Sequence, residues 1–140
     1  MKNYKYTDKI NDFLYKELSY KLVGAFYNVR NSYGSGQKEL VYQNALAEEL
    51  DSLKIPYKKE VSISIKSIKT GRTLGNYKLD FVVDEKIIVE TKAMKFTPTK
   101  IEQQLYSYLR STSYKIGYLV NFGSTNLFIK RVIFTKDYEK

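Results

Sequence analysis

The sequence predicts an α/β or α+β domain in which helices flank a mixed β-sheet. Apolar side chains recur every three or four positions in residues 8–31, which is the period of an amphipathic helix. Residues 61–66 instead alternate apolar and polar side chains, which is the period of a strand with one wet face. No glycine-rich phosphate loop is present, so a βαβ nucleotide-binding fold is not expected.

The first element is a long N-terminal helix, expected over residues 8–31 with Thr7 as its cap. Gly24 lies inside this helix, where glycine costs about 1 kcal/mol relative to alanine. It indicates either a break or a close helix contact. A second helix begins at Ser35 or Gly36 and runs to about Leu53.

A third helix begins at Thr97-Pro98, with the threonine hydroxyl as cap and the proline at the first helical position, and it ends near Ser111. Five apolar segments bounded by turn residues are the expected strands. They are residues 61–66, 74–83, 87–93, 116–122 and 127–134. The expected order is helix, helix, three strands, helix, two strands.

Length and composition restrict the domain organisation and the chemistry. Residues 1–140 are expected to form a single domain, and no segment approaches the roughly 20 apolar residues that span a bilayer. The first residues lack a signal-peptide apolar segment, so a cytoplasmic location is expected. Without cysteine or histidine, the chain can have no disulfide, thiolate metal site or histidine base. A net charge of +9 suits nucleic acid, although lysine-rich composition alone gives a similar charge.

The candidate chemistry lies in Lys78-Leu79-Asp80 and in Glu90-Thr91-Lys92, ten residues later. A tight turn between two strands would bring Asp80 near Glu90, and alternation puts Glu90 and Lys92 on one face of their strand. Two carboxylates and an ammonium group at one place suit Mg²⁺-assisted hydrolysis of a phosphodiester. The alternative is that the spacing occurs by chance in a charged hairpin.

Two further polar residues fall at positions where a helix is expected to be buried. Glu39 lies on the inward stripe of the second helix, or else is a carboxylate that complements the dipole at the helix start. Gln104 shares the inward face of the third helix with Ile101 and Tyr108, and a buried glutamine needs partners. A partly exposed glutamine at the helix edge is the simpler alternative.

Together these residues resemble a known family. Residues 36–42 fit the pattern Gly-x-x-Glu-x-x-Tyr of the GxxExxY proteins, and the resemblance covers roughly residues 16–134. The other motifs follow in the order of that family: Lys78-Leu79-Asp80, Val89-Glu90-Thr91-Lys92-Ala93, Gln104-Leu105-Tyr106-Ser107-Tyr108-Leu109 and Asn121-Phe122-Gly123. The GxxExxY proteins look like members of the PD-(D/E)XK nuclease superfamily. The resemblance therefore implies a restriction-endonuclease-like α/β core.

The resemblance also implies roles for individual residues. The metal ligands would be Glu39, Asp80, Glu90 and the backbone carbonyl of Thr91, with Mg²⁺ or Mn²⁺ as the ion. Lys92 would position and activate the attacking water. Gln104 and Tyr108 would support the site at the substrate. Lys78 replaces the arginine that the family usually has there, and lysine loses bidentate phosphate geometry.

Three functions are compatible with these residues. The first is a Mg²⁺-dependent nuclease that acts on nucleic acid, with DNA the expected substrate. The second is a non-catalytic module on a nuclease fold that binds nucleic acid or protein, because fold alone does not prove activity. The third is a structural protein whose charged hairpin faces solvent. The long N-terminal helix is also a candidate homodimer surface.

Overall fold

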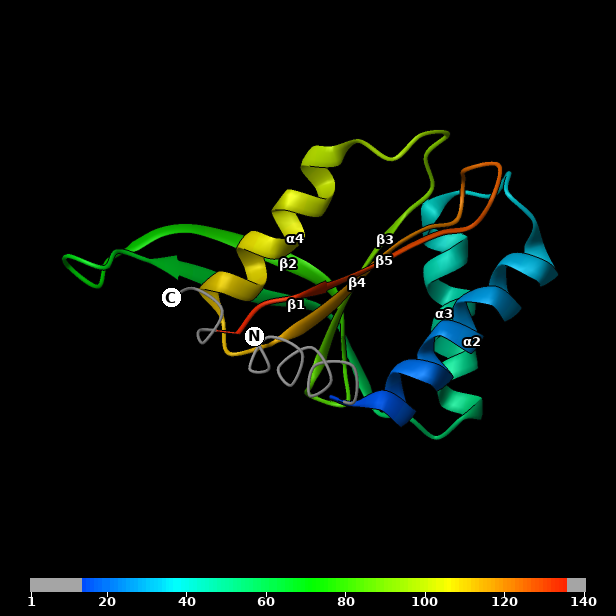
Figure 1. Cartoon of the computed structure of the whole chain (residues 1–140), viewed down its shortest axis with the longest axis horizontal. Helices are drawn as coiled ribbons and strands as arrows, with labels where there is room; N and C mark the ends of the chain where they lie inside the picture. The colour runs from blue at the N-terminus through cyan, green and yellow to red at the C-terminus, as the bar shows by residue number, and fades with distance from the viewer. Residues whose placement is uncertain (1–13, 136–140) are drawn as a thin grey trace, which may run out of the picture.

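The structure is a computed structural model that describes residues 14–135, and its elements follow the predicted order. The labels below are those of Figure 1. The elements are α2 (Lys16–Tyr33), α3 (Glu39–Ser52), β1 (Tyr57–Lys66), β2 (Thr73–Val83), β3 (Ile87–Lys92), α4 (Thr99–Ser111), β4 (Ile116–Asn121) and β5 (Phe128–Ile133). No helix in this described range is long and apolar enough to cross a membrane.

The five strands form one mixed sheet in the order β1-β2-β3-β4-β5. Neighbouring strands are antiparallel except for β3 and β4, which are parallel. Parallel strands need a crossover connection, and α4 supplies it between β3 and β4. The central strands β3 and β4 are buried almost throughout because helices cover both faces of the sheet. The predicted mixed sheet with flanking helices is confirmed.

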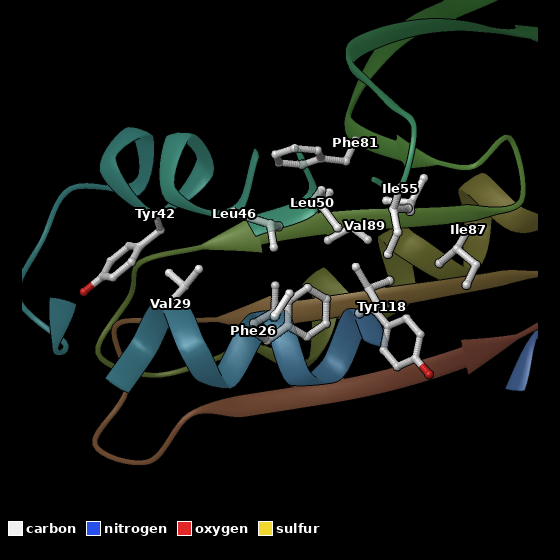
Figure 2. Packing of buried hydrophobic residues seen from close by; sticks show 14 of the residues in the cluster. Phe26, Val29, Tyr42, Leu46, Leu50, Ile55, Phe81, Ile87, Val89 and Tyr118 are labelled. Atoms are coloured by element: carbon white, nitrogen blue, oxygen red, sulfur yellow. The ribbon is translucent and has the colours of Figure 1, made fainter. Parts of the chain in front are cut away.

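The helices form two layers on opposite faces of the sheet (Figure 1). One layer consists of α2 and α3, and Figure 2 shows Phe26, Leu46 and Val89 meeting between these helices and the sheet. The other layer is α4, whose Leu105 and Leu109 pack in a second apolar cluster. The amphipathic patterns read from the sequence thus correspond to two separate cores.

At Glu60 the buried side chains of the β1–β2 hairpin change from one side of the sheet to the other. Glu60 itself adopts a left-handed φ of 53°. Before it, Lys59 pairs with Phe81, and Phe81 packs in the α2/α3 layer. Beyond it, Val61 pairs with Leu79, and both pack on the α4 side. The hairpin then extends past the helices as a protruding arm (Figure 1).

The predicted start of the long helix is wrong at residues 14 and 15. Tyr15 has a left-handed φ of 53°, so the described helix begins at Lys16, while Thr7 and residues 8–13 lie outside the described residues. Gly24 marks neither a break nor a close contact, because α2 runs through it and a Cβ there would meet nothing within 4 Å.

The predicted threonine cap of α4 is also wrong. Pro98 occupies the N-cap position, and no side chain caps the helix start. The Thr97 hydroxyl instead accepts a hydrogen bond from the side-chain amide of Asn121 at 2.7 Å. Thr97 therefore ties α4 to the end of β4 rather than to its own first turn.

Candidate active site

The candidate site lies where β2 and β3 separate. Their backbone pairing runs through Phe81 and Val89, and the next opposed residues are Asp80 and Glu90. Here side chains replace backbone carbonyls as acceptors. The Asp80 N–H donates to Glu90 Oε2 at 3.1 Å, and the Thr91 N–H donates to Asp80 Oδ2 at 2.8 Å. The predicted proximity of the two carboxylates on adjacent strands is confirmed.

A chain of hydrogen bonds links Asp80 to α3. The Thr91 hydroxyl donates to Asp80 Oδ2 at 3.0 Å and accepts from Gln43 Nε2 at 2.8 Å. Gln43 Nε2 also donates to Glu39 Oε2 at 3.0 Å. Glu39 is the first residue of α3 and is half-buried, so it meets both sequence-based interpretations: it faces the site and it occupies the helix start.

The electrostatics of the site favour an added positive charge. Burial raises the pKa of Glu90 to about 8, and the neighbouring charge of Asp80 acts in the same direction. The Asp80 N–H and the charge of Lys92 oppose this rise. Burial and Asp80 likewise raise the pKa of Glu39, and Lys92 again acts in the opposite direction. One ammonium group therefore compensates three carboxylates only in part.

The segment after Lys92 is fixed against the end of β4. The Phe122 N–H donates to the Lys92 carbonyl at 2.8 Å. The buried Asn121 accepts the N–H groups of Met94 and Gly123 through its side-chain oxygen, at 2.9 and 3.0 Å. A Cβ on Gly123 would lie 2.6 Å from the backbone of Met94, so only glycine allows this approach. These contacts hold the strand end that carries Lys92.

Helix α4 buries Tyr108 near Glu90 and leaves Gln104 exposed. Tyr108 is only 6% exposed, and burial together with the charge of Glu90 raises its pKa to about 12. Its ring packs against Tyr77 of β2 at 5.3 Å between centroids. Gln104 is exposed, so its predicted burial is wrong. Leu105, Tyr108 and Leu109 form the buried face of α4, and Gln104 lies at the edge of that face.

Lys78 lies outside this cluster of side chains. It is exposed on β2, where it pairs with Ser62 of β1. Its position two residues before Asp80 places it at the root of the protruding arm.

Tyr42 fixes the loop that precedes Glu39. Its hydroxyl donates to the Gly34 carbonyl at 2.6 Å and accepts the Gln37 N–H at 3.1 Å. Its buried ring stacks on Phe122 at 4.7 Å between centroids. Tyr42 thus anchors the start of α3, which carries Glu39, on the same segment that fixes Lys92. A Cβ on Gly36 would meet nothing within 4 Å, so packing does not explain that glycine.

Sequence reasoning missed Gln43, which joins Glu39 to Thr91. Its position four residues after Glu39, one helical turn further on, was the available signal. The side-chain contacts of Asn121 were also missed, although the residue belongs to the motif Asn121-Phe122-Gly123. Asn121 binds Met94 and Thr97, and these residues lie in a loop whose sequence has no periodicity that would predict the contacts.

The donor set suits a hard divalent cation, because it offers only oxygen atoms and excess negative charge. Within residues 14–135, no three acidic side chains are grouped so that they could hold a metal ion by themselves. The close pair is Asp80 and Glu90, and Glu39 connects to it through Gln43 and Thr91. A pair of carboxylates is sufficient for Mg²⁺, which commonly keeps several of its waters.

Comparison with known proteins gives one family. Residues 16–132 match the family model described as PD-(D/E)XK nuclease superfamily. No curated protein and no solved structure matches the chain. The match spans both helical layers and all five strands, so it includes the residues that surround Asp80 and Glu90. With a match over most of its length and the mixed sheet already described, the chain belongs to the PD-(D/E)XK nuclease superfamily.

Proposed function

We propose that this chain is a Mg²⁺-dependent nuclease that hydrolyses phosphodiester bonds in DNA, with Mn²⁺ as the alternative ion. The observation that carries the proposal is the Asp80–Glu90 pair, which replaces backbone pairing at the point where β2 and β3 separate. Burial raises the pKa of Glu90 to about 8, and carboxylates with strongly shifted pKa values cluster at functional sites. Membership in a nuclease superfamily supports the same activity.

The side chains divide into ligands and positioning groups. Asp80, Glu90 and the Thr91 carbonyl would hold the ion, with Glu39 joining directly or through water. When bound, Mg²⁺ would supply Lewis-acid stabilisation of the phosphate charge. Lys92 would orient the attacking water from the end of β3. Gln43 would keep Glu39 and Thr91 in register through its two hydrogen bonds.

The remaining predicted residues would act on the substrate side. Tyr108 lies close enough for the charge of Glu90 to affect its pKa, which supports a role beside the scissile phosphate. Gln104 is exposed and would contact substrate from the surface of α4. Lys78 would supply a single positive charge to the backbone of the substrate. We also assign the chain to the GxxExxY group on the spacing of Gly36, Glu39 and Tyr42.

The proposal is tested with two matched variants of the β2–β3 hairpin. Asp80→Asn removes a charge from the site, and Asp84→Asn removes one from the turn, where Asp84 pairs with Lys86 at 3.3 Å. Plasmid nicking is followed with Mg²⁺, with Mn²⁺ and with chelator. We expect cleavage by wild type and Asp84→Asn in either metal, none by Asp80→Asn and none with chelator.

The same proteins separate the nuclease from the non-catalytic alternative. A wild-type chain that binds DNA but never cleaves it would be a binding module on a nuclease fold. If Mg²⁺ or Mn²⁺ at millimolar concentration raises the Tm of wild type and Asp80→Asn equally, the ion binds elsewhere.

The homodimer through the N-terminal helix stays a prediction. The outward face of α2 exposes Tyr20 and Tyr27 beside Leu53. Sedimentation equilibrium of wild type and Tyr20→Ser/Tyr27→Ser tests it: a monomeric wild type would remove the prediction, and dimer loss in the variant would locate the interface on α2.

A further inference from the structure

The protruding β1–β2 arm carries positive charge without compensating negative charge. Between Glu60 and Asp80 the chain has no acidic residue but contains four basic ones, namely Lys66, Lys69, Arg72 and Lys78. All four are exposed. The arm is thus locally basic, although residues 103–136 also lack acidic residues.

One face of the arm consists of exposed polar side chains. Register places Ser62 opposite Lys78 and Ser64 opposite Asn76. Ser64 Oγ donates to Asn76 Oδ1 at 2.7 Å, and further along the arm Lys66 Nζ donates to Thr73 Oγ1 at 2.8 Å. The arm therefore presents an ordered row of hydrogen-bonding groups to solvent.

The tip of the arm is also ordered. Ser67 and Arg72 close it through backbone hydrogen bonding at 2.7 Å, and Gly71 adopts the left-handed φ of 76° that the turn needs. The Ser67 hydroxyl accepts the N–H groups of Lys69 and Thr70, each at 3.1 Å. Ile68 is fully exposed on this tip. The turn thus presents an exposed apolar side chain in the same six-residue tip as two cationic ones, Lys69 and Arg72.

The root of the arm is fixed relative to the candidate site. Leu79 packs in the α4 layer and Tyr77 packs on Tyr108. Asp80 follows directly on the same strand. Thr73 lies seven positions before Asp80, so at about 3.3 Å per residue the tip begins roughly 23 Å from the carboxylates. That distance corresponds to about seven base pairs of B-form DNA.

We propose that residues 62–78 form a DNA-binding arm that enters the major groove of a duplex about seven base pairs from the cleaved bond. This inference rests on the proposed nuclease function. A two-stranded β-ribbon fits the major groove of B-form DNA, whereas the major groove of A-form RNA is too narrow. The serine, asparagine and lysine row contacts phosphates, and exposed Ile68 contacts thymine methyl groups at the floor of the groove.

The test compares two double variants that lose the same net charge. Lys69→Gln/Arg72→Gln removes the cations of the tip. Lys54→Gln/Lys115→Gln removes two exposed cations that adjoin β1 and β4 at the end of the sheet remote from the carboxylates. Both are made in a Lys92→Ala background so that substrate stays intact. Binding to a 20-base-pair duplex is measured by fluorescence anisotropy over a range of salt concentrations.

We expect the tip variant to bind at least 10-fold more weakly than the control variant. The slope of log binding constant against log salt concentration should be about 1.8 smaller in magnitude for the tip variant, because each lost phosphate contact removes about 0.9 from it. A duplex that extends only four base pairs from the cleaved bond should bind both variants equally, since it does not reach the tip. Unchanged Tm values would show that the arm remains folded.

Equal loss of affinity in both double variants would overturn the inference that the arm binds DNA, because net charge alone would then explain binding. Equal affinity for single-stranded DNA of the same length would also overturn it, since no groove would be needed. If wild type cleaves DNA while the tip variant binds like the control, only the arm inference fails. If wild type neither binds nor cleaves DNA, the proposed function fails with it.

Discussion

Glu90 accepts the backbone N–H of Asp80 at 3.1 Å, so one acidic side chain satisfies the amide of the strand that carries the other. An antiparallel sheet would normally use a backbone carbonyl at this position. Because the Glu90 side chain takes the place of that carbonyl, a buried carboxylate lies beside a second one, and backbone pairing of the two strands stops at this point. Stability and metal binding are therefore coupled at Glu90, which makes its pKa a useful observable.

The metal-free protein should lose stability as pH rises. The folded-state pKa of Glu90, about 8, lies above its ordinary value of 4.5, so the stability that its protonation contributes is complete below pH 4.5 and is lost as pH rises through 8. The free energy of unfolding should fall by up to about 1.4 kcal/mol per pH unit in this window. Urea unfolding in chelator measures it. Glu90→Gln should flatten the profile, whereas Glu48→Gln, an exposed position on α3, should keep it.

Lys92→Ala should abolish most cleavage without unfolding the protein. Loss of one preorganised electrostatic contact lowers the rate by about 100- to 1000-fold. Metal affinity should hold or improve, because a positive charge that lowers the pKa of Glu90 and Glu39 is removed. Single-turnover cleavage and calorimetric Mn²⁺ titration measure the two quantities. Lys95→Ala, an exposed lysine nearby, should cleave like wild type; an active Lys92→Ala protein would contradict the assigned role.

Gln43→Ala should weaken metal binding although Gln43 is not itself an ion ligand. The variant loses the hydrogen bonds that orient Glu39 and Thr91, and groups of this kind commonly contribute 10- to 100-fold in metal affinity. Calorimetry with Mn²⁺ measures the change. Asn44→Ala, the next and exposed residue on α3, is the control. Equal Mn²⁺ affinity in both variants would show that Gln43 has no positioning role.

Gly123→Ala should destabilise the segment after Lys92. The added Cβ would meet the backbone at Ala93 and Met94 at 2.6 Å, and neither atom belongs to a flexible side chain. The cost should be about 1–3 kcal/mol, as in other overpacked sites, and is measured by thermal unfolding. Gly24→Ala is the matched substitution in open space and should instead stabilise α2 by about 1 kcal/mol. A neutral Gly123→Ala variant would remove the argument for close approach.

Local patterns were sufficient to predict the elements and the carboxylate pair. The apolar periods of α2 and α3 and the ten-residue spacing from Asp80 to Glu90 are local properties of the chain, and both are confirmed. The left-handed backbone at Tyr15 and Glu60 has no such signal, since neither residue type favours that conformation. These two positions decide where α2 begins and which face the arm presents.

The supporting contacts of the site depend on segments far apart in the sequence. Thr97 is followed by proline and resembles a helix cap, but the amide of Asn121 uses its hydroxyl. Gln104 lies at a helical spacing from Tyr108, yet the sheet covers only the face that contains Leu105 and Leu109. Periodicity gives the relative angle of two side chains on a helix, whereas the position of the sheet decides which of them is buried.

The kink at Glu60 has a consequence for the behaviour of the protein at high concentration. In the described sheet β1 is an edge strand of ten residues, long enough to template pairing with another chain. The left-handed residue interrupts its row of free N–H and C=O groups near the middle, and Lys58 and Lys66 place charge on either side. An arm that must stay exposed is thereby protected against edge-to-edge aggregation.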